Sequence, residues 1–285
     1  MSDEKKLVRK LELKKGIYIL PSLFTCANMA FGILSIVSSI DGWFIRAAWL
    51  LTFALACDII DGRIARLTHT TSDFGLQLDS LSDLISFGIA PALMIYMLVL
   101  KEMDKIGIAI AVLFVLCSAL RLARYNVMAL KGISFENFKG LPTPASAGVL
   151  ISFVLSYELL GPEGTSLNIR TVPILMQTMP VFFKAMPVIM VVLSFLMVSN
   201  IPYYSFKMLQ LNKTRTIRFL VVFIVFVLLI IVFPQNVFFI IFVIYTLSGF
   251  IMLATTSIRK RKKRRPKRIR KRRRPSAEAD TAPQQ

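Results

Sequence analysis

The stretch Cys57–Asp83, CDIIDGRIARLTHTTSDFGLQLDSLSD, contains four aspartates that lie within otherwise apolar segments: Asp58, Asp61, Asp79 and Asp83. Asp58 and Asp61 are three residues apart, and Asp79 and Asp83 are four residues apart. Because residues three or four apart share a helix face, each pair directs both carboxylates to one side of its helix. A carboxylate inside a membrane helix is costly and usually serves a function. The stretch therefore predicts two helices whose acidic faces converge on a functional site.

Converging carboxylates repel one another strongly unless cations lie between them. Oxygen ligands suit hard divalent ions such as Mg²⁺ or Mn²⁺, and Mg²⁺ commonly bridges carboxylates and substrate phosphates. Gly62 and Ala65 continue the first acidic face, and Arg66 adds a positive charge one turn beyond Gly62. These residues predict phosphoryl-group chemistry on a lipid-linked diphosphate, with two divalent cations and one carboxylate acting as general base.

The whole chain has the composition of a polytopic, all-α membrane protein. It has 285 residues, of which 55% are hydrophobic, and a mean hydropathy of +0.66. Crossing a bilayer takes about 20 apolar residues. Eight stretches meet this requirement: 17–40, 43–62, 76–99, 106–128, 142–160, 181–201, 217–234 and 237–257. The segment 161–180 is broken by prolines and polar residues, and we expect it to be an outside loop.

The distribution of lysine and arginine predicts the orientation. If the N-terminus is cytoplasmic, the inside segments hold 30 of the 35 Lys and Arg residues. Because basic residues favour the cytoplasmic side, both termini and the acidic cluster are predicted to be cytoplasmic. No signal-peptide pattern is evident. We expect four parts: a basic N-terminal segment (1–16), a six-helix catalytic domain (17–202), two further helices (203–257) and a polybasic, disordered tail (258–285).

The tail has 14 basic residues in the 16 positions of 259–274. Such a run next to a membrane is attracted to anionic lipid, at about 1 kcal/mol per charge. Binding to nucleic acid is the alternative, because phosphate backbones attract the same charges. Since the tail begins a few residues after the last apolar stretch, contact with lipid is favoured.

The acidic motif resembles the signature of the CDP-alcohol phosphotransferase family at every defining position. The motif reads Asp58-x-x-Asp61-Gly62-x-x-Ala65-Arg66, eight further residues, and Gly75-x-x-x-Asp79-x-x-x-Asp83. The resemblance implies a six-helix core that binds a CDP-linked lipid and two metal ions, the displacement of CMP by an alcohol, and a homodimer.

The resemblance also implies a role for each residue of the motif. Asp58, Asp61 and Asp79 would be metal ligands. Asp83 would lie beside the metals and take the proton of the acceptor hydroxyl. Glycine and alanine at the small positions, together with Arg66, would contact the CDP-linked substrate.

Four further segments are similar to the bacterial phosphatidylserine synthase branch of this family. They are PSLFTCANMAFG (Pro21–Gly32), ALRLARYN (Ala119–Asn126), FKGLPTPASAG (Phe138–Gly148) and SNIPYYSFK (Ser199–Lys207). The similarity implies CDP-diacylglycerol and L-serine as substrates and a bacterial inner membrane as the location. Choline, glycerol 3-phosphate or an inositol compound remains an alternative acceptor. A transporter is a further alternative, but the second half of the chain holds no inverted repeat of the acidic pair.

Several residues outside the motif have two interpretations. Arg121 and Arg124 either contact the diphosphate or the serine carboxylate, or anchor the chain on the positive side. Asn28 either bonds a motif aspartate or the nucleotide, or joins two helices. The segment around Gly140, with Pro142 and Pro144, forms either a re-entrant loop or a helix start.

The three cysteines, Cys26, Cys57 and Cys117, lie in apolar stretches. Their odd number and wide spacing argue against a disulfide framework. We expect them to pack in the core as small hydrophobic residues.

Overall fold

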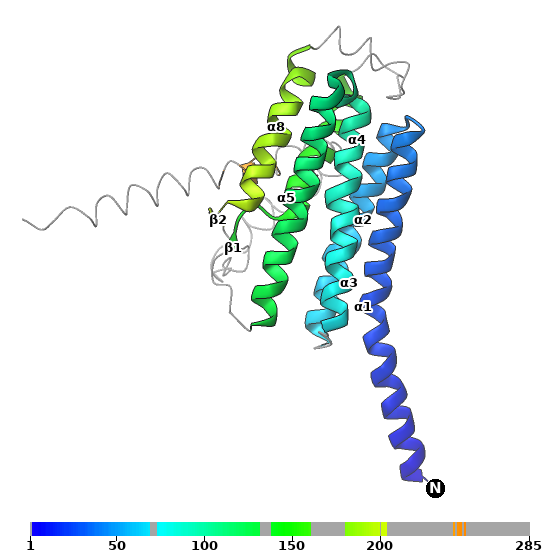
Figure 1. The fold of residues 1–285 in the computed structure, drawn as a ribbon. Coiled ribbons are helices and arrows are strands. Elements are labelled where there is room, and N and C mark those ends of the chain that lie inside the picture. The colour runs from blue at the N-terminus through cyan, green and yellow to red at the C-terminus, as the bar shows by residue number, and fades with distance from the viewer. Residues whose placement is uncertain are drawn as a thin grey trace, which may run out of the picture.

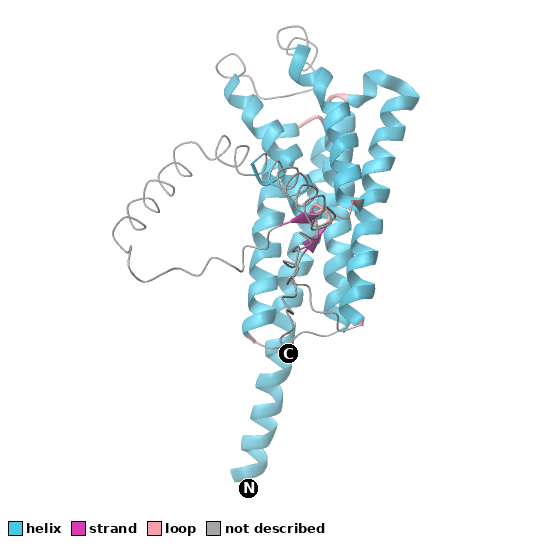
Figure 2. Cartoon of the chain, turned by 90° about the vertical axis from the view of Figure 1, so that its left-hand side faces the viewer, coloured by secondary structure: helices cyan, strands magenta, loops and turns pink. Residues whose placement is uncertain are grey.

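The protein is a bundle of long helices that run side by side (Figure 1 and Figure 2). The computed structural model describes residues 2–68, 73–131, 138–160, 180–199 and 201–203, together with residues 242, 244–246 and 248. Its helices are α1 (Ser2–Ile40), α2 (Phe44–Leu67), α3 (Asp73–Asp83), α4 (Ala90–Leu98), α5 (Asp104–Leu130), α6 (Thr143–Leu160) and α8 (Pro180–Val198).

Short elements connect these helices. The π-helical segment η1 (Leu84–Ile89) joins α3 to α4, and the 3₁₀ segment η2 (Leu100–Met103) precedes α5. The strands β1 (Phe138–Lys139) and β2 (Pro202–Tyr203) form a two-stranded antiparallel pair.

The first six predicted apolar stretches each correspond to helical structure. The third stretch is built from α3, η1 and α4 in succession, and the fifth, near the prolines, is α6. The predicted loop at 161–180 lies outside the described residues except for Pro180, which begins α8. Nearly all of the seventh and eighth stretches and the whole tail also lie outside the described residues. The all-α class is confirmed, whereas the total of eight helices stays a prediction.

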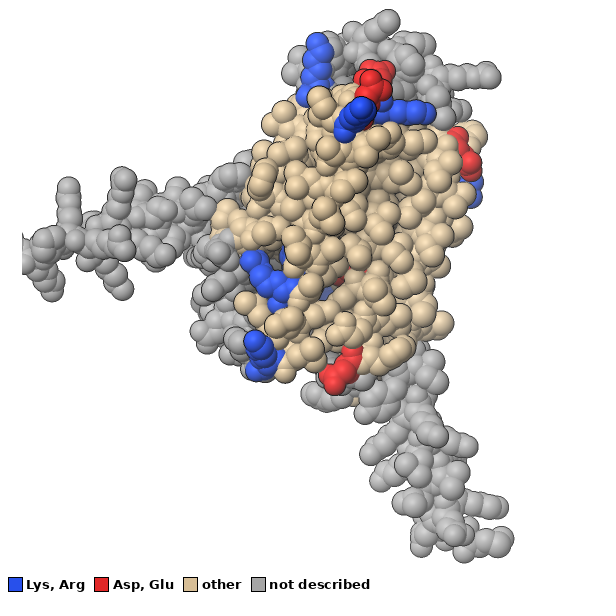
Figure 3. All heavy atoms as spheres, in the orientation of Figure 1, with Lys and Arg blue, Asp and Glu red and all other residues tan. Residues whose placement is uncertain are grey.

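Within the described residues, three stretches are long and apolar enough to cross a membrane: Pro21–Ile40, Asp73–Leu98 and Leu100–Leu130. Shorter apolar stretches occur in α6, at Thr143–Ser156, and in α8, at Lys184–Val198. On the face shown in Figure 3, uncharged side chains cover the middle of the bundle, and the charged ones lie mainly toward its upper and lower ends. The chain is an integral membrane protein.

Small polar side chains fix α1 against the acidic helices. Ser82 at the end of α3 donates a hydrogen bond to the backbone oxygen of Thr25 at 3.0 Å, and Ser86 in η1 donates to that of Asn28 at 2.9 Å. A Cβ at Gly32 would collide with the Ser86 hydroxyl, so the glycine allows this close approach. These contacts bring α1 and the α3–η1 segment together next to the aspartates.

The segment before α6 is a helix start that is tied to the end of α8. Gly140 has a φ of 86°, a conformation that L side chains rarely adopt, and its N–H donates to the Ile201 oxygen at 2.9 Å. The Leu141 N–H donates to the Leu196 oxygen at 3.0 Å. Pro144 lies in the first turn of α6, where its missing N–H is tolerated. Of the two interpretations of this segment, the contacts support the helix start.

The prediction that all three cysteines pack in the core is wrong for one of them. Cys117 is buried and Cys57 is half-buried, but Cys26 is exposed on α1. An apolar neighbourhood in a membrane helix does not distinguish a face toward the bundle from a face toward lipid, because both are apolar. All three thiols are free.

Candidate active site

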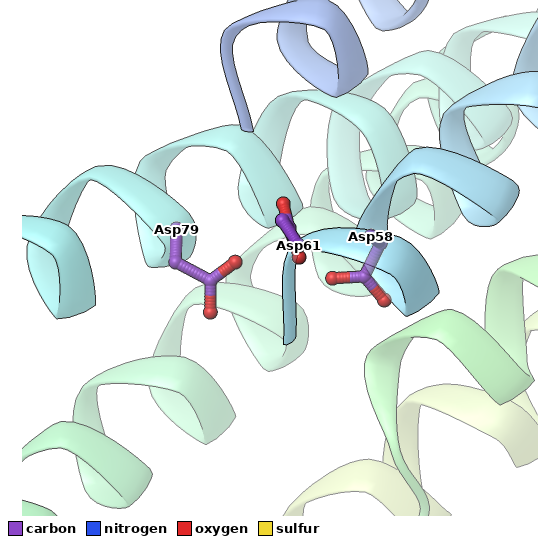
Figure 4. Close-up of side chains that lie close together, drawn as sticks. All are labelled: Asp58, Asp61 and Asp79. Atoms are coloured by element: carbon purple, nitrogen blue, oxygen red, sulfur yellow. The ribbon is translucent and has the colours of Figure 1, made fainter. Parts of the chain in front are cut away.

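Three of the four aspartates converge at the ends of α2 and α3. Asp58 and Asp61 come from the last three turns of α2, and Asp79 comes from the middle of α3. One carboxylate oxygen from each lies within 4.8 Å of the others. Figure 4 shows Asp58 and Asp79 on opposite sides of the group, with Asp61 between them. The predicted convergence of carboxylates from two helices is therefore observed for Asp58, Asp61 and Asp79.

Thr25 of α1 orients the central aspartate. Its hydroxyl lies 3.0 Å from the Asp61 Oδ2 atom and 3.1 Å from the Pro21 backbone oxygen, so one hydroxyl proton has two acceptors within reach. Asp61 is only 4% exposed, and Thr25 is 5% exposed. A buried carboxylate oxygen held by a hydroxyl is fixed in place, which prepares it to act as a ligand.

Asp83 lies beside this group and differs from it. Its carboxyl group is within hydrogen-bonding range of Asp58, and it also interacts electrostatically with Arg121. The side chain is 9% exposed, and among the described residues its Oδ1 atom has no hydrogen-bond partner. A buried acceptor without a partner costs free energy, so the atom is available for a substrate proton or for water.

The three-aspartate group fits a divalent metal ion. All of its donors are carboxylate oxygens, which hard cations prefer. Negative charges this close, two of them on half-buried side chains and one on a buried side chain, repel one another in the absence of a cation. Asp58, Asp61 and Asp79 can therefore hold a metal, and Asp83 stands within reach of one of these ligands.

The small residues of the motif belong to the same two helices as the aspartates. Gly62 and Ala65 are half-buried in the last two turns of α2, and Gly75 is half-buried in the first turn of α3. Arg66 also belongs to the last turn of α2, and its side chain lies outside the described part of the molecule. The structure leaves the roles of these four residues as predictions.

The two arginines of α5 have different surroundings. Arg121 donates a hydrogen bond from Nη1 to the Thr143 hydroxyl at 2.7 Å and faces Asp83. Arg124 donates from Nη1 to the Val198 oxygen at 3.2 Å and from Nη2 to the Ser199 oxygen at 3.4 Å. A cation at these last carbonyls stabilises the C-terminus of α8.

Asn28 is fully buried on α1, one turn deeper than Thr25. Within the described residues, neither atom of its side-chain amide has a hydrogen-bond partner. Buried amides normally have hydrogen-bond partners, so the Asn28 side chain can bind a substrate group or a water molecule. Its predicted contact with an aspartate or the nucleotide is not among the contacts that the structure shows.

A polar link between α3 and α5 went unpredicted. Ser80 donates to the Asn126 Oδ1 atom at 3.0 Å, and the Asn126 Nδ2 atom donates to Gln77 at 3.3 Å. Gln77 and Ser80 lie on either side of Asp79 in the sequence, so this link holds the turn of α3 that carries Asp79. A hint was available, because Asn126 closes the ALRLARYN segment.

The chain is similar to known proteins over most of its length. Residues 18–178 match the family model described as CDP-alcohol phosphatidyltransferase. A CDP-diacylglycerol–serine O-phosphatidyltransferase of Helicobacter pylori is 34% identical over 238 residues, covering 82% of this chain and 91% of that protein. A Bacillus subtilis protein of the same name is 29% identical over 188 residues, covering 66% of this chain and 91% of its own. An archaetidylserine synthase of Methanothermobacter thermautotrophicus is 43% identical over 139 residues, covering 48% of this chain and 58% of that protein.

Proposed function

Because the chain belongs to the CDP-alcohol phosphatidyltransferase family, we propose that it transfers a phosphatidyl group from CDP-diacylglycerol to the hydroxyl of L-serine. The products are phosphatidylserine and CMP. The observation that carries this proposal is the convergence of Asp58, Asp61 and Asp79 in a membrane protein. The choice of serine is supported by the printed names of relatives that align with most of the chain.

The residues divide the reaction between them. Asp58, Asp61 and Asp79 would hold two divalent cations, Mg²⁺ or Mn²⁺, which would supply positive charge against the diphosphate. Asp83 takes the proton of the serine hydroxyl as its oxygen bonds to the lipid-bearing phosphorus. The bond from that phosphorus to the bridging oxygen breaks, and CMP leaves with the oxygen. Asp83 suits the role of base because its Oδ1 atom is buried and has no partner among the described residues.

The small residues shape the nucleotide site. Gly62 and Ala65 lie against the cytidine, where a larger side chain would clash, and Gly75 leaves room at the start of α3. Arg66 provides a guanidinium for a phosphate of the CDP-lipid. A water-soluble nucleotide head would enter from the cytoplasm while the acyl chains stay in the bilayer.

The surroundings of the site follow from the charge distribution of the chain. The active site and both termini lie on the cytoplasmic side of a bacterial inner membrane. Residues 17–202 form the catalytic domain of a protein with eight helices in all, and the protein is a homodimer. The tail contacts anionic lipid.

The test is an assay of the purified protein in mixed micelles with CDP-diacylglycerol, radiolabelled L-serine and titrated metal. Labelled phosphatidylserine and one CMP per lipid are expected. Activity should vanish with a chelator and return with Mg²⁺ or Mn²⁺. Parallel reactions with choline, glycerol 3-phosphate and inositol identify another acceptor if serine is not used. Full turnover in excess chelator would refute the metal-dependent mechanism.

A further inference from the structure

We propose that Arg121 and Thr143 form the subsite for the carboxylate of the acceptor, and that they set the preference for an amino-acid alcohol over other alcohols. The inference rests on the proposed function, because it concerns the second substrate of that reaction. Arg121 makes the contact, and Thr143 is a positioning residue that acts through it.

The Nε–Nη2 edge of the Arg121 guanidinium has the geometry for a carboxylate. Nη1, which does not belong to the Nε–Nη2 edge, donates a hydrogen bond to the Thr143 hydroxyl at 2.7 Å. Nε is buried and has no hydrogen-bond partner within the described part of the chain. Because Nε and Nη2 point along the same edge, they can bind the two oxygens of a carboxylate side by side. A buried N–H without a partner is costly, so an occupant of this edge would be strongly favoured.

Thr143 fixes the orientation of that edge. The residue is fully buried at the first position of α6, and its hydroxyl is held against Arg121. With Nη1 tied to α6, rotation of the guanidinium is restricted and the Nε edge is presented in one direction. The N-terminus of α6 adds a partial positive charge beside the same arginine.

The position of Arg121 within the cluster favours the acceptor over the diphosphate. Of the four aspartates, Asp83 interacts electrostatically with Arg121, and Asp83 in turn lies within hydrogen-bonding range of Asp58 in the metal-binding group. An acceptor held by its carboxylate at Arg121 would therefore have its hydroxyl close to Asp83, where the proton must go. Arg124 is not equivalent, since its guanidinium bonds the carbonyls of Val198 and Ser199.

The experiment compares L-serine with serinol, which keeps the hydroxyl and amine of serine but replaces the carboxylate with a hydroxymethyl group. The readout is the ratio of kcat/KM for serine to kcat/KM for serinol. A charge-assisted pair of hydrogen bonds predicts that Arg121→Gln lowers this ratio about 10- to 100-fold, mainly through the KM for serine. Lys131→Gln, on the exposed end of α5, is the matched control and should keep the wild-type ratio.

Thr143 gives an independent variant if Arg121→Gln fails to accumulate as folded protein. Thr143→Val keeps the shape but removes the hydroxyl, so the ratio should fall in the same direction. Thr143→Ser keeps the hydroxyl and should therefore keep the wild-type ratio. If the role of Thr143 were purely structural, Thr143→Val would lower kcat/KM for both acceptors equally and leave their ratio unchanged.

The outcomes separate this inference from the proposed function. If the wild-type protein makes no lipid from serine, the proposed function fails and the subsite falls with it. If phosphatidylserine is made but the ratio in Arg121→Gln stays within about twofold of wild type, the function stands and the subsite is refuted. Equal loss with both acceptors, together with weaker CDP-lipid binding, would assign Arg121 to the diphosphate and also overturn the inference.

Discussion

Asp83 has the same chemistry as its three neighbours but a different environment. Asp58, Asp61 and Asp79 each place one carboxylate oxygen within 4.8 Å of the others. Asp83 lies next to Asp58 and interacts electrostatically with Arg121. A carboxylate whose charge is committed to cations is a poor base, because bound cations compete with the proton. The position of Asp83 therefore favours its assignment as the residue that handles the proton.

Asparagine variants should separate the two roles. Asp58→Asn or Asp79→Asn removes charge from the metal group, so both metal affinity and turnover should fall. Asp83→Asn should keep much of the metal and CDP-lipid binding but lose about 10²–10⁴-fold in turnover, the usual cost of losing a general base. The measurement pairs CDP-lipid binding with single-turnover chemistry. If Asp83→Asn abolishes binding as completely as Asp58→Asn does, Asp83 is primarily a ligand.

A second residue-scale prediction concerns the nucleotide surface. Ala65→Leu places a larger side chain on the half-buried face next to the aspartates, so the KM for CDP-diacylglycerol should rise at least about tenfold, in line with a contact worth roughly 1.4 kcal/mol. Ala56→Leu is the matched control, because Ala56 is exposed on the same helix. Unchanged kinetics in folded Ala65→Leu protein would mean that the cytidine lies elsewhere.

At the scale of elements, the junction of α1 with the α3–η1 segment positions the site. Ser82 of α3 and Ser86 of η1 donate hydrogen bonds to the α1 backbone, next to Thr25, whose hydroxyl bonds Asp61. The π-helical segment begins at the residue after Asp83, and such segments frequently occur at functional sites. Close packing of small residues is a common means of joining membrane helices.

Gly32→Ala tests this junction. Alanine normally stabilises a helix relative to glycine by about 1 kcal/mol. Here the added methyl group would meet the Ser86 hydroxyl, so we expect a loss of about 1–3 kcal/mol and a lower Tm in detergent. The double variant with Ser86→Ala should recover part of that loss, because the nearest atom is then absent. Ala30→Leu, on the exposed face of α1, is the control; a Tm for Gly32→Ala above wild type would contradict the close contact.

At the scale of the whole molecule, the basic charge is concentrated in the tail. The run at 259–274 lies outside the described residues, and the acidic site is built entirely from α2 and α3 with their neighbours. Attraction to anionic lipid acts through the number of charges near the surface and is screened by salt. The contact of the tail with anionic lipid and catalysis at the acidic site are therefore expected to be separable.

Deleting residues 259–285 should leave turnover in neutral detergent nearly intact. In vesicles, it should weaken any increase in activity caused by anionic lipid, and in the full-length protein that increase should decline with rising salt. The measurement is turnover as a function of anionic lipid fraction at two salt concentrations. Loss of turnover in detergent would place the tail within the catalytic machinery.

The amino-acid sequence by itself determined the features that depend on local periodicity. Long apolar stretches specify membrane helices, since lipid leaves no other partner for the backbone polar groups. Spacings of three and four specify a common helix face for each pair of aspartates. The family, the acidic motif and six of the expected helices follow from these two kinds of pattern.

Only the tertiary structure decided which residues from distant elements meet. Arg121 interacts electrostatically with Asp83, whereas Arg124 donates a hydrogen bond to the end of α8. The two arginines nevertheless lie one turn apart on the same helix. The tertiary structure also joined Thr25 to Asp61 and Asn126 to α3. These contacts depend on how helices rotate and approach one another, which packing between elements controls. Local periodicity assigns a residue to a face, but the helix packed against that face determines what the residue does.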